Sequence, residues 1–229
     1  EFLGLGFQHY HYSNKAVSNE REYLNKIAGM EKNSAVVVQL PLAKGINYSI
    51  LNAIPAEKDP DLLSDKAVGL FFNGRSLVDP PTAAAILMIR DEYGIPLRNK
   101  RVVLFGYGRL VGKFLAPLLI KRGAVIAVLE KNVAREVVLD ISSKADIIIS
   151  AVGEPGLITA DMVKDGAAVV DAGFSIVSGK ITGDVDFNSV KDKTSFITPV
   201  PGGVGPVGVA ELFANVIELF KLSNKKQHR

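Results

Sequence analysis

A glycine-rich turn between two apolar segments constrains the fold of this chain more than any other feature. The segment Gly106-Tyr-Gly-Arg-Leu-Val-Gly112 follows an apolar run at 101–105 and opens a helical pattern at 110–122, and a second apolar run occupies 125–129. This order is typical of a βαβ unit, whose glycines let backbone N–H groups approach a pyrophosphate at the amino end of the helix. Because the motif has one residue more than the commonest spacing, a tight turn without a ligand is the competing interpretation.

Two further apolar segments extend this unit into a sheet. Residues 146–152 and 167–171 read as strands, and a helix is expected at 159–164 between them. Strands that alternate with helices indicate a parallel sheet. The apolar residues of 207–222 lie on one broad face, which predicts an amphipathic helix. We therefore predict an α/β fold with a Rossmann-like parallel-sheet domain.

The amino-terminal part predicts a second, smaller α/β domain. We expect strands at 4–12 and 35–40, a helix from Ser18 to about Met30, a short helix at 49–54 and a loop at 57–61. Pro80-Pro81-Thr82 is a helix-entry signal before the strong helix formers of 83–93. We place the domain boundary at this entry signal.

Composition excludes several classes of protein. The chain has 229 residues, a formal net charge of +3 and 48% hydrophobic residues, which is typical of an ordinary globular protein. It has no cysteine and three histidines, so cysteine metal sites and disulfides are excluded. Lys and Arg are spread along the chain, which argues against a nucleic-acid partner, and no apolar stretch is long enough to span a membrane.

An acidic residue after the second strand bears on the choice of nucleotide. Glu130 lies 24 residues after Gly106, where a carboxylate can accept hydrogen bonds from an adenosine ribose. It would repel a ribose phosphate, so NAD is favoured over NADP, although Arg109 and Lys131 could neutralise such a phosphate. The alternative is a solvated charge at the end of a strand.

A second turn combines three prolines and three glycines just before the last helix. It runs from Ile197 to Pro206. Prolines restrict φ and glycines permit close approach of the backbone, which suits a rigid wall under a flat ligand. A stiff connector between domains is the alternative.

Four motifs resemble those of one enzyme family in the same order. They are Val-Gln-Leu-Pro-Leu at 38–42, Lys-Asp-Pro-Asp at 58–61, Gly-Asp-Val-Asp-Phe at 183–187 and the turn at 197–206. Together they resemble the bifunctional methylenetetrahydrofolate dehydrogenase/methenyltetrahydrofolate cyclohydrolase family, with the similarity running from about Gly4 to Leu219. The resemblance implies two domains with a cleft between them. The folate domain would comprise 1–82, completed by 206–229, and the NAD(P)-binding domain 83–205.

The resemblance also implies the chemistry, the partners and the site. It implies oxidation of methylenetetrahydrofolate with NAD or NADP, and hydrolysis of the product as the family's second activity. It also implies a homodimer that binds tetrahydrofolate derivatives and lies in the cytoplasm, with a mitochondrial location as the alternative. Gln39 and Asp61 would be catalytic. The substrate would also contact Val38, Leu40, Pro201, Gly202, Gly203, Val204 and Gly205, and the cofactor would contact Gly106, Tyr107, Gly108, Arg109, Glu130 and Phe174. The residues alone allow other roles: a buried structural amide for Gln39, and a cap on Leu63 or Ser64 for Asp61.

The chain departs from the family pattern at several positions. The family's catalytic Lys should fall a few residues before Glu1, Leu62 replaces a glycine beside the pterin, and the turn at 106–108 lacks an Arg expected to meet a ribose phosphate. We expect Leu62 to crowd the pocket, the hydrolysis to suffer first, and NAD to be preferred. A non-catalytic homologue that binds folate or nucleotide is the alternative function.

Overall fold

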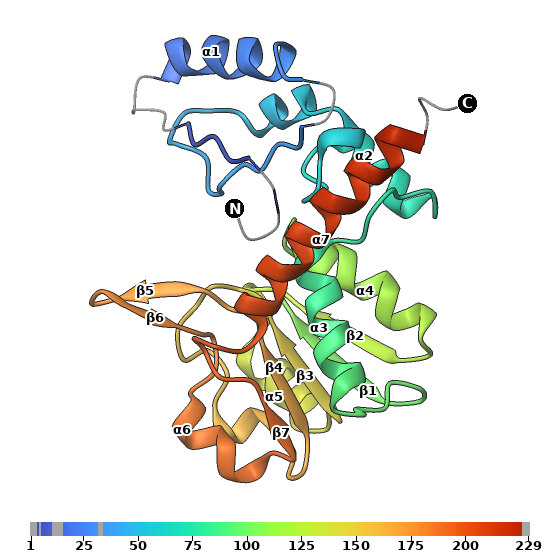
Figure 1. The fold of residues 1–229 in the computed structure, drawn as a ribbon. Helices are drawn as coiled ribbons and strands as arrows, with labels where there is room; N and C mark the ends of the chain where they lie inside the picture. Colours follow the sequence, from blue (N-terminus) through green and yellow to red (C-terminus); the bar gives the residue numbers. More distant parts are fainter. Residues whose placement is uncertain (1–3, 5, 11–15, 32–33, 226–229) are drawn as a thin grey trace. The chain divides into compact units, whose positions relative to one another are not determined.

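The computed structural model describes residues 4, 6–10, 16–31 and 34–225, and it divides the chain into two compact units (Figure 1). Unit 1 comprises residues 1–77 and 218–229, and unit 2 comprises residues 78–217. Helix α7 (Val204–Lys225) contributes residues to both units.

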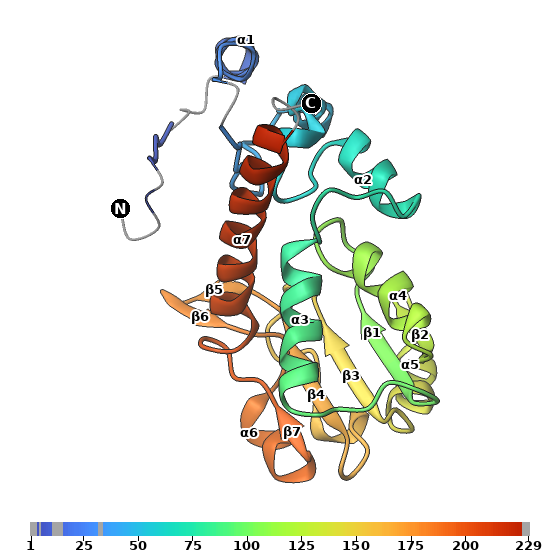
Figure 2. The same cartoon turned by 45° about the vertical axis from the view of Figure 1, so that its right-hand side comes forward.

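A five-stranded parallel sheet forms the centre of unit 2 (Figure 2). Its strands lie in the order β2-β1-β3-β4-β7 and are β1 (Arg101–Phe105), β2 (Val125–Leu129), β3 (Ile147–Ser150), β4 (Ala168–Asp171) and β7 (Phe196–Ile197). Every pairing is parallel, and β1 pairs along its whole length with β2. The predicted parallel-sheet fold is confirmed.

Helices cover both faces of this sheet because the central strands are apolar on both sides. All residues of β3 and β4 are buried. Ile147 and Ile149 face helices α3 (Pro81–Glu92) and α4 (Gly112–Lys121), and Ile148 packs in a cluster that includes side chains of α5 (Arg135–Ser142). The result is a three-layer α/β/α arrangement, the usual solution for a parallel sheet.

The remaining elements of unit 2 are short. A hairpin is formed by β5 (Ser175–Val177) and β6 (Lys180–Thr182), and it is followed by α6 (Phe187–Val190) and the 3-10 turn η4 (Lys191–Lys193). The helix expected at 159–164 is only the 3-10 turn η3 (Ala160–Met162). We did not expect α5, the hairpin or the two-residue strand β7 from the sequence.

Unit 1 consists of helices and turns joined by irregular chain. Its elements are α1 (Ala16–Ala28), the 3-10 helices η1 (Tyr48–Ala53) and η2 (Ala56–Lys58), α2 (Asp65–Phe72) and the end of α7. The side chain of Asn47 caps η1 and that of Ser64 caps α2, each by accepting a hydrogen bond from a backbone N–H. The core of unit 1 includes Leu51, Ile54, Leu62 and Leu63, each at most 1% exposed.

The strands predicted in unit 1 are wrong. Residues 4, 6–10 and 35–40 are not strands in the structure, and positions 5, 11 and 12 of the first prediction lie outside the described residues. A strand requires a neighbouring strand, and the backbone N–H of Val36 instead donates to the carbonyl of Lys58. Within its described residues unit 1 therefore contains no sheet, so the expected second α/β domain is not observed there.

Helix α7 is anchored to the start of α3 within unit 2. The side-chain amide of Asn215 donates to the carbonyl of Asp79, and Asn215 is only 7% exposed. Over the described ranges of the chain, neither α7 nor any other helix is both long and apolar enough to cross a bilayer.

A buried hydroxyl in α5 offers a test of this packing. The Oγ of Ser142 is fully buried and finds no hydrogen-bond partner among the described residues. Because an unpaired buried hydroxyl is costly, we expect Ser142→Ala to raise the free energy of unfolding by about 1 kcal/mol, measured by urea denaturation.

The adjacent serine provides a matched control. The Oγ of Ser143 donates to the carbonyl of Leu139 at 2.6 Å, so Ser143→Ala should lower the free energy of unfolding. If the two substitutions changed the free energy of unfolding equally, hydrogen bonding of the hydroxyl would not be the cause of the change.

Candidate functional site

The glycine turn after β1 is tightly packed at its ends and open in its middle. Gly106 has a φ of +89°, and a Cβ placed on Gly112 would lie 2.1 Å from the carbonyl oxygen of Gly106. A Cβ on Gly108, in contrast, would meet no atom within 4 Å. Gly112 is therefore needed for packing of helix α4 on the turn, and Gly106 for its positive φ and its close approach to the backbone of Ala151. Gly108 leaves space beside the backbone, as a turn that binds phosphate requires.

Glu130 is attached to this turn. The carboxylate of Glu130, which directly follows β2, accepts a hydrogen bond from the backbone N–H of Tyr107. Both side chains are exposed, and Arg109 lies partly exposed in the same turn. The structure thus brings Glu130 to the turn, and it uses one N–H group that would otherwise be available to a pyrophosphate.

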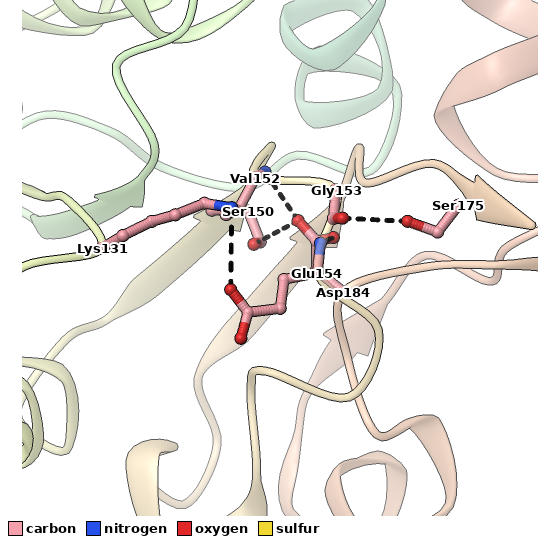
Figure 3. A network of polar contacts seen from close by, with 7 residues as sticks. All are labelled: Lys131, Ser150, Val152, Gly153, Glu154, Ser175 and Asp184. Carbon is pink, nitrogen blue, oxygen red and sulfur yellow. Dashed lines mark hydrogen bonds and ion pairs between the residues drawn. The ribbon is translucent and has the colours of Figure 1, made fainter. Parts of the chain in front are cut away.

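A buried carboxylate organises the loops beyond β3. Asp184 is fully buried, and its two oxygens accept hydrogen bonds from Ser150 Oγ and from the backbone N–H groups of Val152 and Glu154 (Figure 3). The donor–acceptor distances are 2.7–2.8 Å. Asp184 therefore joins the chain after the hairpin to the carboxyl end of β3.

A second buried carboxylate continues this network at the end of β4. Asp171 accepts hydrogen bonds from the backbone N–H groups of Gly173, Asp184 and Val185. Burial raises the pKa of the Asp171 carboxyl, and these hydrogen bonds oppose the rise. The sequence offered a signal for Asp184 alone, the Gly-Asp-Val-Asp-Phe motif at 183–187, which contributed to the resemblance without a role for this aspartate.

The proline-glycine turn lies on the same edge of the sheet as the glycine turn. It follows β7, and its Thr198 Oγ1 accepts the backbone N–H of Asp171 at 2.8 Å. Pro201 and Gly202 are exposed, Gly203 is half-buried, Val204 is buried at the start of α7, and Gly205 is exposed on that helix. Since β7 is three strands away from β1, the two turns are separated by roughly 14 Å along the carboxyl edge.

Phe174 completes this edge. It lies between β4 and β5 and is 62% exposed. All six residues predicted to contact the cofactor therefore belong to the carboxyl edge of one sheet, where ligands of open α/β folds bind.

In unit 1 the structure separates the roles of two neighbouring aspartates. Asp59 is fully buried and accepts hydrogen bonds from the N–H groups of Leu63 and Ser64 and from Ser64 Oγ. The capping role considered for Asp61 therefore belongs to Asp59. Among the described residues, no hydrogen bond to the Asp61 carboxylate is found, and its burial, together with the charge of Asp59, raises the pKa of Asp61 to about 7.

Gln39 is available for contacts with a ligand. Its side chain is exposed and donates only to the adjacent carbonyl of Leu40 among the described residues, while Val38 and Leu40 are half-buried. The alternative of a buried structural amide does not apply.

Leu62 does not crowd an open pocket. Its backbone has a φ of +52°, the left-handed conformation that a glycine adopts easily, and its side chain is only 1% exposed. The side chain packs in the core of unit 1, so the expectation of crowding is wrong.

Comparisons with known proteins agree with this geometry. A family model described as "Tetrahydrofolate dehydrogenase/cyclohydrolase, NAD(P)-binding domain" matches residues 80–224. A relative from Fusobacterium nucleatum named "Bifunctional protein FolD" is 42% identical over 227 residues, which cover 96% of this chain and 78% of that protein. The chain belongs to the FolD family of methylenetetrahydrofolate dehydrogenase/cyclohydrolases.

Solved structures support the same assignment. The FolD methylenetetrahydrofolate dehydrogenase/cyclohydrolase of Campylobacter jejuni is 34% identical with a TM-score of 0.83, covering 93% of this chain and 76% of that one. The FolD of Trypanosoma brucei, complexed with NADP and an inhibitor, is 35% identical with a TM-score of 0.83, covering 93% and 74%. The resemblance seen in the sequence is confirmed, and the FolD NAD(P)-binding domain model spans the whole sheet of unit 2.

The glycine turn of this FolD homologue can be tested with a matched pair. We expect Gly108→Ala to fold with unchanged stability and to bind NAD or NADP at least tenfold more weakly, because its methyl group occupies the space beside the turn. Gly112→Ala should lower the free energy of unfolding by several kcal/mol, since its Cβ clashes with backbone. Thermal unfolding and calorimetric titration distinguish the two; full nucleotide affinity in Gly108→Ala would contradict this assignment.

Proposed function

We propose that the chain is an NAD(P)-dependent methylenetetrahydrofolate dehydrogenase. The observation that carries the proposal is the shared carboxyl edge of unit 2, on which an open glycine turn and an exposed proline-glycine turn lie roughly 14 Å apart. This span suits an extended dinucleotide whose pyrophosphate lies at Gly108 and whose nicotinamide lies toward Phe174 and Gly202. Membership of the FolD family supports the choice of reaction.

The reaction makes few acid–base demands on the protein. The lone pair of a folate nitrogen expels a hydride from the methylene carbon and leaves an iminium, so no base is required for this step. When bound, NAD(P) would supply the hydride acceptor, and the residues of the glycine turn and the proline-glycine turn would hold it. The residues at the sheet edge would orient the nicotinamide ring, and the residues of unit 1 would orient the folate.

We assign recognition of the folate to unit 1. The Asp61 carboxylate, which has no internal partner among the described residues, accepts the N–H donors of the pterin, and the exposed amide of Gln39 orients the substrate. Hydrolysis of the methenyl product needs an oriented water, for which Gln39 is also the candidate. Unit 1, with the end of α7, is thus the proposed folate domain, and unit 2 the proposed nucleotide domain.

NAD is the proposed preferred cofactor. Glu130 carries a negative charge at the turn, beside the position of an adenosine ribose, and it would repel a ribose phosphate. NADP remains a possible cofactor where a neighbouring cation offsets this repulsion.

The decisive assay follows reduction of NAD and NADP by methylenetetrahydrofolate as a function of pH. We expect kcat/KM for the folate to increase as the pH rises through about 7, because only the ionised Asp61 accepts the pterin donors. The Asp61→Asn variant should not show this increase with pH, and its kcat/KM should be at least tenfold lower than that of the parent. Absence of nucleotide reduction with intact folate binding would favour the alternative, a non-catalytic homologue.

A stability measurement checks the same carboxyl independently. When the pKa of a carboxyl is raised in the folded state, the free energy of unfolding of the protein falls as the pH rises from the carboxyl's unfolded pKa, near 3.8, to its folded pKa, about 7 for Asp61. The stability of Asp61→Asn relative to the parent should therefore increase over this interval and level off above it. A difference in stability between the two proteins that stays constant over this interval would contradict the raised pKa of Asp61.

We further propose that the chain forms a homodimer through the β5–β6 hairpin. Ile176 and Ile181 are directly opposed in the hairpin and are 67% and 44% exposed. Together with the nearby Phe174 they form an apolar surface of a kind that marks interfaces.

Charge placed in this surface should dissociate the dimer. Ile176→Asp is expected to convert the dimer to a monomer in sedimentation experiments, because a carboxylate would be buried without a partner. Ile120→Asp, which changes an equally exposed isoleucine on α4, should leave the dimer intact. A dimer that withstands Ile176→Asp would exclude the hairpin as the interface.

A further inference from the structure

An ion pair crosses the carboxyl end of strand β1. Lys131 lies two residues after β2 and Glu154 lies in the loop after β3, and Lys131 Nζ is 3.8 Å from Glu154 Oε2 (Figure 3). Because β1 is the strand between β2 and β3, this ion pair passes over the place where the glycine turn begins. It therefore lies across the proposed path of the dinucleotide.

The carboxylate of Glu130 and the backbone of Glu154 are held by hydrogen bonds, whereas among the described residues the ammonium group of Lys131 is held only by its ion pair. Glu130 is bonded to the backbone of Tyr107. The backbone of Glu154 is bonded to the buried Asp184. The Lys131 side chain is 63% exposed, and an ion pair of this exposure contributes little stability. Lys131 can thus leave Glu154 at small cost when a stronger anion is present.

We propose that Lys131 is the residue that lets this site accept a 2′-phosphorylated nucleotide, and that Glu154 limits this acceptance by competing for the Lys131 ammonium. The inference rests on the nucleotide site proposed above. In a fold of this kind the adenosine ribose of a bound dinucleotide would lie next to the end of β2, and Lys131 is the second residue after that strand. A phosphate offers Lys131 a charge-assisted hydrogen bond and offsets the repulsion from Glu130. Lys131 is then a specificity residue, and Glu154 is a positioning residue that acts through it.

Paired affinity measurements on the full chain test this inference. Calorimetric titration with NADP and NAD, and with the fragments 2′,5′-ADP and 5′-AMP, isolates the contribution of the 2′-phosphate. We expect Lys131→Ala to weaken binding of NADP and 2′,5′-ADP about tenfold and to change binding of NAD and 5′-AMP by less than twofold. Glu154→Gln should strengthen binding of NADP about threefold and leave that of NAD unchanged.

Two controls separate a local contact from a change in net charge. Lys144→Ala removes the same charge just after α5, where Lys144 pairs with Asp140 of that helix, and should affect the binding of neither cofactor. In the double variant Lys131→Ala/Glu154→Gln, the gain in NADP affinity from Glu154→Gln should disappear. If Glu154 had a purely structural role, the same gain would remain in the absence of Lys131.

The failures of the two proposals are distinguishable. Equal losses for NADP and NAD in Lys131→Ala, or an equal effect of Lys144→Ala, would overturn the role of Lys131 while leaving the nucleotide site intact. A parent chain that binds none of the four nucleotides would overturn the inference together with the nucleotide site. Selective loss of NADP binding in a chain that transfers no hydride would support Lys131 and count against the proposed dehydrogenase.

Discussion

The hydrogen bonds of two buried carboxylates hold together the edge of the sheet on which the proposed chemistry takes place. Asp184 binds the end of β3 and the loop after it, and Asp171 binds the chain on either side of the hairpin. A buried carboxylate is costly unless it is fully hydrogen-bonded, so each one requires the backbone around it to adopt one conformation. The positions of Glu154, Phe174 and the proline-glycine turn all depend on this network.

Two other aspartates illustrate how surroundings assign a role to a residue type. Asp59 and Asp61 are separated by one residue, yet Asp59 is fully hydrogen-bonded by the start of α2 and Asp61 is not. The Asp59 carboxylate uses its hydrogen-bond acceptors within the fold. The Asp61 carboxylate is left partly buried beside a like charge, with a raised pKa and unused acceptors, which is typical of groups that act on ligands.

Much of unit 2 could be predicted because its signals are local. The strands at 101–105 and 125–129 were predicted with their observed bounds, and the glycine turn and Glu130 were expected on one edge. The amino-terminal strands were wrong because an apolar run such as 35–40 reports burial and β-propensity, not the presence of a pairing strand. The hairpin and β7 were missed because segments of two or three residues carry no periodic signal.

The sequence by itself determined the alternation of strands and helices, the glycine turn and the motifs that identify the family, since each depends on residues close together in the chain. Only the tertiary structure decided which aspartate accepts the hydrogen bonds of Leu63 and Ser64, that Leu62 points into the core, and that Lys131 reaches Glu154 across the end of β1. The ion pair depends on two segments that the strand order brings together, and the roles of Asp59 and Leu62 depend on which side chains the fold buries. Such contacts arise from strand order and from the hydrogen-bonding demands of buried groups, which no single stretch of sequence contains.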